Sequence, residues 1–123
     1  MSVTVNAERI NDRIKLIRHR LIARRLAVDP TLVDRAKLRV REALTSGQAL
    51  ECTYEWDRLL RQDISTVRRA IVSRSEEMDR LRLSSPLAAV LPLADEATRR
   101  RFWKKARLGV ATDTGNHVQM VYN

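Results

Sequence analysis

The side chains that could bind a metal ion or act as a general base are few and far apart in this sequence. His19, His117 and Cys52 are the only imidazoles and the only thiol. A zinc site needs a cluster of nitrogen, sulfur or carboxylate ligands, and these three residues follow no ligand spacing. We therefore expect no metal and no cofactor. A single cysteine also excludes an intrachain disulfide framework.

Ser84 and Ser85 are the most suggestive nucleophile candidates, because they stand between a charged run and the apolar stretch that starts at Pro86. Serine hydrolases commonly show a G-x-S-x-G elbow, which is missing here, and neither serine has a histidine nearby in sequence. Serine competes for backbone hydrogen bonds and proline stops a helix. The pattern therefore predicts the end of a helix and not a catalytic site.

A third arrangement concerns Arg13 and His19, which are separated by five residues. This spacing resembles the arginine-to-histidine spacing of HEPN-type ribonucleases, which are also small helical proteins. The alternative is that both side chains lie on a solvated helix face. A chance match is frequent in a chain with so many arginines, so we expect a protein that is not an enzyme.

Two further stretches have the composition of binding surfaces. Leu59–Ile71 could hold a turn and a DNA recognition helix, which would expose the possible nucleic-acid-binding residues Ser65, Thr66, Arg68 and Arg69. Residues 99–107 combine six basic residues with two aromatic ones. Arginine and tryptophan are favoured in protein interfaces, and the alternative is a solvated helix with one aromatic side chain in the core. The predicted partner contacts are Arg99, Arg100, Arg101, Trp103, Lys104, Lys105 and Tyr122.

Length and composition favour one small helical domain. The chain has 123 residues and a formal net charge of +9, with three glycines and three prolines, which are too few for a turn-rich all-β protein. The basic residues are concentrated at the two ends, as expected for binding an acidic protein or a phosphate backbone. No signal peptide and no membrane span are apparent, so we expect a cytoplasmic protein.

Apolar periodicity and capping residues predict an all-α bundle of five or six helices. Asp29 and Pro30 mark a short link, which should fold the first two helices into an N-terminal hairpin. Ser73 and Glu76 have the spacing of a capping box, and the last helix is basic. The expected helices cover residues 7–27, 30–45, 49–61, 64–71, 73–83 and 96–108. We expect a helical domain over residues 1–109 and a tail over 110–123 that is flexible or bound to a partner.

Residues 79–107, DRLRLSSPLAAVLPLADEATRRRFWKKAR, resemble the C-terminal pattern of a group of small helical bacterial proteins. In that group a Leu-Arg-x-Ser-Ser-Pro motif is followed by an apolar run and a helix with aromatic and basic residues. Residues 21–40 resemble the group's helix-Asp-Pro-helix opening. Leu87 and Ala89 depart from the group, which has Phe and Gly there. The group is associated with two-gene toxin–antitoxin-like modules beside a nucleotidyltransferase-like protein.

This resemblance implies a non-enzymatic antitoxin-like protein that neutralises a cognate toxin. Two alternative functions stay open. The chain could bind nucleic acid, for example as a DNA-binding autorepressor, or it could itself be the toxin, with ribonuclease-like activity. Oligomer formation is compatible with each of these functions.

Overall fold

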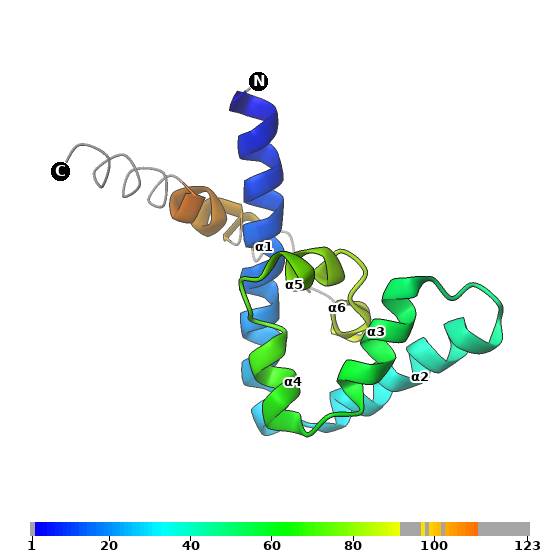
Figure 1. Cartoon of the computed structure of the whole chain (residues 1–123). Helices are drawn as coiled ribbons and strands as arrows, with labels where there is room; N and C mark the ends of the chain where they lie inside the picture. The colour runs from blue at the N-terminus through cyan, green and yellow to red at the C-terminus, as the bar shows by residue number, and fades with distance from the viewer. Residues whose placement is uncertain (1, 92–96, 98, 102, 111–123) are drawn as a thin grey trace. The chain divides into compact units, whose positions relative to one another are not determined.

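The longest helix, α1 (Ser2–Val28), has a buried stripe that differs from the expected one. The buried side chains Leu16, His19, Ala23 and Leu26 recur at intervals of three, four and three residues, which places them on one helix face. Apolar periodicity predicts a stripe through Ile10, Ile14, Ile17 and Leu21, widened by Leu16, Ile22 and Leu26. Ile17 and the three widening residues are buried, whereas Leu21 is 41% exposed. The computed structural model describes residues 2–91, 97, 99–101 and 103–110 (Figure 1).

Five shorter helices follow α1, and the described residues form no strand. The predicted all-α class is therefore confirmed. The short helices are α2 (Thr31–Thr45), α3 (Glu51–Leu60), α4 (Ile64–Ala70), α5 (Glu76–Arg82) and α6 (Pro86–Val90).

The capping side chains at the start of α4, α5 and α6 are those of Asp63, Ser75 and Ser85, respectively. The Asp29 carboxylate accepts hydrogen bonds from the backbone N–H and the hydroxyl of Thr31. The N-cap of α2 is Pro30, which has no capping side chain, and α2 starts one residue later than predicted. The Ser75 hydroxyl accepts from Met78 N and caps α5. The prediction that Ser73 provides this cap is wrong, because its hydroxyl accepts from Ser75 N in the preceding turn.

Helix α6 was not predicted. Ser85 is its N-cap and accepts a hydrogen bond from Ala88 N at 3.3 Å, and Pro86 occupies the first turn. Proline fits this position, because its missing N–H would have no partner inside the helix. The serine-proline pair therefore ends α5 as expected, and it also starts a new five-residue helix.

All six helices contribute side chains to the core of the unit Arg18–Pro92, and Trp56 is the largest of its fully buried side chains. The indole Nε1 donates to Leu81 O at 2.9 Å, so this large side chain is both buried and fixed in orientation. Helix α2 makes its main helix–helix contacts with α3 and α6. The link at Asp29 and Pro30 is as short as predicted, but α2 diverges from α1 and runs antiparallel beside α3 (Figure 1).

The chain divides into two units, Arg18–Pro92 and Met1–Ile17 with Leu93–Asn123. In the second unit, residue 97, residues 99–101 and residues 103–110 are helical, where a basic C-terminal helix was expected. Of the predicted tail, only Val110 lies within the described residues. No described helix is both long enough and apolar enough to cross a membrane.

Candidate functional site

The predicted partner contacts lie on residues 99–107, which we call the basic segment. Its described residues are helical, and the side chains of Arg99, Arg100, Arg101, Trp103, Lys104 and Lys105 are exposed. The remaining predicted contact, Tyr122, lies outside the described residues. At 100° per residue, Arg101, Lys104 and Lys105 fall on one helix face, opposite the fully buried Ala106.

Trp103 lies on another side of the same helix, because at 100° per residue it stands about 160° from Arg101 and Lys105 and about 40° from Arg107. It is 47% exposed, and the guanidinium carbon of Arg107 lies 5.5 Å from the centre of its ring. This distance permits a cation–π interaction, which holds the indole beside this positive charge. The basic segment thus combines a half-exposed aromatic ring with cations, as partner-binding surfaces often do.

The arrangement of the predicted nucleic-acid residues on α4 differs from the expectation. Thr66 and Arg68 are only partly exposed, whereas Ser65 and Arg69 are exposed as predicted. Arg68 Nε donates to Ala23 O in α1 at 2.7 Å. This bond directs the arginine toward the unit itself, so the expectation that all four side chains face solvent is wrong.

The hydroxyls of Ser65 and Thr66 are bonded to the carboxylate of Asp63, the N-cap of α4. Ser65 Oγ donates to Oδ2 at 2.5 Å and Thr66 Oγ1 donates to Oδ1 at 2.6 Å. Thr66 N donates to Oδ2 as well, at 3.3 Å. These bonds, that of Ser65 first, lower the pKa of Asp63 to about 2. The two hydroxyls therefore stabilise the start of α4.

His19 and Ser85, which are far apart in sequence, form a buried pair. His19 Nε2 lies 2.7 Å from Ser85 Oγ; His19 is fully buried and Ser85 is 8% exposed. His19 therefore does not lie on a solvated face, which was the alternative interpretation of its spacing from Arg13, and the fold brings to Ser85 a histidine that is distant in sequence. Because Ser85 Oγ already accepts from Ala88 N, its own proton is available for His19. The N-cap of α6 is thus bonded to a buried side chain of α1.

A second bond joins the same two helices. Arg18 Nη2 donates to Ala88 O at 3.5 Å, and burial lowers the pKa of Arg18. Adjacent residues of α1 therefore contact both the N-cap and the middle residue of α6. The sequence shows His19 only as one residue in a cationic stretch, and its spacing from Leu16 and Leu26 is compatible with burial but does not require it.

Arg82 is a second buried polar residue that the sequence analysis missed. It is 2% exposed, and its Nη1 donates to Ile71 O at 2.9 Å and to Ser73 O at 2.7 Å. Its Nη2 pairs with Asp79. One member of the acidic run at the start of α5 is thus bound to Arg82, which connects this helix to the preceding loop.

No metal site is found in the described part of the chain, where no three His, Cys, Asp or Glu side chains form a suitable group. Cys52 is a free thiol of intermediate exposure. His117 lies outside the described residues.

Comparisons of the chain with family models, with curated proteins and with solved structures find no match. The toxin–antitoxin-like resemblance therefore stays a prediction.

Proposed function

We propose that this chain is a non-enzymatic, antitoxin-like protein of the bacterial cytoplasm, and that its basic segment binds an acidic surface of a cognate toxin. The observation that carries the proposal is the exposure of Arg101, Trp103, Lys104 and Lys105 in a stretch without a single acidic residue. The resemblance of residues 79–107 supplies the toxin–antitoxin context and a nucleotidyltransferase-like protein as the candidate partner.

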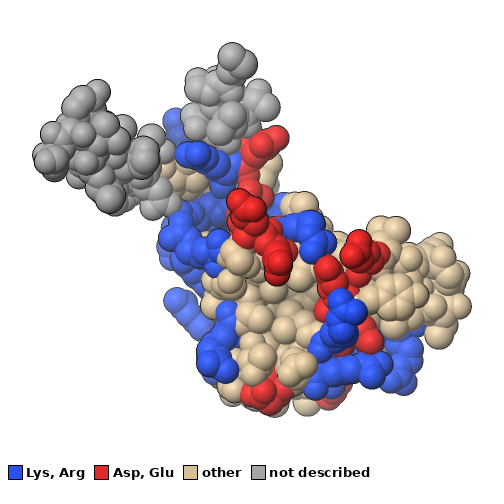
Figure 2. All heavy atoms as spheres, in the orientation of Figure 1, with Lys and Arg blue, Asp and Glu red and all other residues tan. Residues whose placement is uncertain are grey.

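The charge distribution favours the basic segment as the partner-binding site over the rest of the described surface. On the visible face of the unit Arg18–Pro92, acidic side chains stand among the basic ones (Figure 2). Intermixed charges partly neutralise one another. A dense cationic helix increases the rate of encounter with an acidic protein, and Trp103 would provide the apolar anchor that tight complexes need.

The test is co-purification of the chain with the product of the neighbouring gene, followed by calorimetric titration. The variant reverses three charges on the exposed face: Arg101→Glu, Lys104→Glu and Lys105→Glu. We expect the affinity to fall at least 100-fold, because each cation would then repel an acidic partner. Trp103→Ala should weaken binding about 30-fold, as expected for an aromatic anchor at an interface.

A matched control reverses three exposed arginines of the other unit: Arg24→Glu, Arg41→Glu and Arg58→Glu. It changes the net charge equally and should retain most of the affinity. Equal losses in the two triple variants would show that total charge and not the basic segment determines binding. Growth arrest on expression of the chain alone would instead identify it as the toxin.

A second candidate function is nucleic-acid binding, and the contact between Trp103 and Arg107 favours it. A half-exposed indole beside cations can stack on a base while the cations bind phosphates. The measurement is a mobility-shift assay of the chain with its own upstream DNA over a range of salt concentrations. Binding that weakens steeply with salt would support this function, and no shift at low salt would exclude it.

A further inference from the structure

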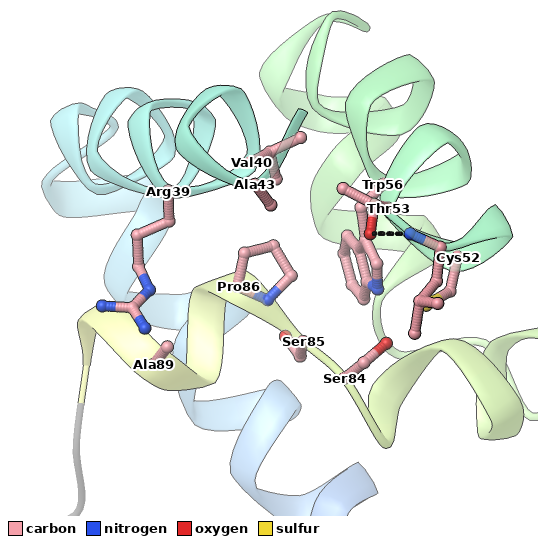
Figure 3. Close-up of a pocket in the computed structure, with 11 residues that line it drawn as sticks. Arg39, Val40, Ala43, Cys52, Thr53, Trp56, Ser84, Ser85, Pro86 and Ala89 are labelled. Carbon is pink, nitrogen blue, oxygen red and sulfur yellow. Dashed lines mark hydrogen bonds between the residues drawn. The ribbon is translucent and has the colours of Figure 1, made fainter. Parts of the chain in front are cut away.

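A cavity of about 270 Å³ lies among α2, α3 and α6, entirely within the unit Arg18–Pro92 (Figure 3). Most of its wall is apolar. Val40 and Ala43 come from α2, Trp56 from α3, and Pro86 and Ala89 from α6. The cavity is open to solvent, and its volume is well above that of one water and just below the usual range of ligand pockets.

Arg39 is the one charged residue in the lining of this cavity. Its side chain extends from α2 past Pro86 toward Ala89 (Figure 3). The guanidinium has no hydrogen-bond or ion-pair partner among the described residues. An arginine at the edge of an apolar cavity favours a ligand with one negative charge and an apolar body.

The wall of the cavity is held in place by bonds that do not use Arg39. Trp56 is fixed by its bond to Leu81 O, and Thr53 Oγ1 accepts from Leu50 N at 3.1 Å (Figure 3). Ser85, which also lines the cavity, is bonded to His19 on the side of α1. A wall already fixed in the free protein lowers the entropic cost of binding.

We propose that this cavity binds a small organic carboxylate. The planar guanidinium of Arg39, whose side chain is exposed, pairs with the two carboxylate oxygens, and the apolar body of the ligand packs against Leu50 and Ala89, the exposed apolar side chains of the lining. A phosphate ester fits less well, because a dianion needs more positive charge than one arginine supplies. This site shares no residue with the basic segment, so the inference is independent of the proposed partner binding.

The probe is cyclohexanecarboxylate, and its neutral amide, cyclohexanecarboxamide, is the matched control. In a Trp103→Phe background, Trp56 is the only remaining indole, so its fluorescence reports on the cavity. We expect a saturable change with the carboxylate and a Kd on the order of 1 mM, as is usual for a fragment of this size. The amide should bind at least 10-fold more weakly.

Two variants test the assignment of the site. Arg39→Gln should weaken carboxylate binding at least 10-fold, whereas Arg35→Gln, at an exposed position one turn away on α2, should not. Ala89→Phe replaces an exposed side chain of the lining and should block binding without affecting the core. Circular dichroism checks that each variant is folded.

Several outcomes would overturn the inference. They are the absence of a saturable response in the Trp103→Phe protein, equal binding of carboxylate and amide, and unchanged binding in Arg39→Gln. Inorganic phosphate that matched the carboxylate in affinity would also overturn it, because the apolar wall would then have no part in binding.

Discussion

In the unit Arg18–Pro92 the buried polar side chains are bonded within the unit, whereas the cations of the basic segment are exposed. His19 is bonded to Ser85, and Arg82 is bonded to two backbone carbonyls and to Asp79. Buried polar groups need such partners, because an unmade hydrogen bond inside a protein is costly. Exposed charges have no such requirement and contribute little to stability. We therefore expect buried, hydrogen-bonded polar residues to maintain the fold and the exposed cations of the basic segment to contact a partner.

Arg82→Ala should have the largest effect on stability in this comparison. The substitution leaves Ile71 O, Ser73 O and Asp79 without their guanidinium donor, two of these acceptors being backbone carbonyls of the loop before α5. We expect a loss of about 3 kcal/mol in the free energy of unfolding, typical of breaking a buried charged network. Urea denaturation followed by circular dichroism measures it.

Arg80→Ala is the control for Arg82→Ala, because Arg80 is on the same helix and pairs with Glu55 at 2.9 Å on the surface. Its removal should have a much smaller effect, since surface ion pairs contribute little. A similar decrease in the free energy of unfolding in both variants would contradict the difference we expect between buried and exposed charges.

Ser85→Ala should reduce the free energy of unfolding by about 2 kcal/mol, because it removes the N-cap of α6 and the partner of His19 together. The neighbouring Ser84→Ala is a natural control. Ser84 is exposed, and its hydroxyl reaches only Leu81 O, at 3.5 Å, so its loss should change stability by less than about 0.5 kcal/mol. Thermal denaturation of the two variants compares adjacent serines, and a larger effect at Ser84 would contradict the structural role of the buried pair.

The contrast between α6 and the longer helices shows how much of the fold the sequence could predict. Helices α2 to α5 have apolar periodicity or capping residues within their own segments, and their approximate positions were predicted. Helix α6 is five residues long and depends on bonds from Arg18 and His19, more than 60 residues away. A short helix has little stability of its own, so a local pattern could not reveal it.

The candidate site was predictable only in part, for a related reason. Exposure of the basic segment follows from its local density of charge. The burial of His19 does not, because the apolar pairs in α1 allow two helix faces. Ile17 is buried as predicted and Leu21 is not, because tertiary packing placed the buried face toward Leu16 and Leu26. The burial of Arg82 likewise depends on carbonyls of the preceding loop.

The Asp63 cap makes a pH-dependent contribution to α4, smaller than the contributions of the buried network and the buried pair. Its folded-state pKa of about 2 lies below the usual value near 4. The charged carboxylate therefore stabilises the fold at neutral pH, and this contribution is lost as the pH falls through the folded-state pKa. Asp63→Asn keeps a side-chain acceptor but should flatten this part of the stability profile between about pH 4 and pH 2. An unchanged acid profile in urea titrations would show that the cap does not contribute.

The smallest effects are expected in the basic segment. Arg101→Ala and Lys105→Ala should each change the free energy of unfolding by less than about 0.5 kcal/mol, because exposed side chains away from capping positions and buried networks seldom contribute more. The measurement is urea denaturation at low and high salt. A loss above about 1 kcal/mol in either variant would mean that these cations stabilise their own unit and are not available to a partner. If a variant keeps its free energy of unfolding but binds the partner more weakly, the cations act in partner binding and not in stabilising the fold.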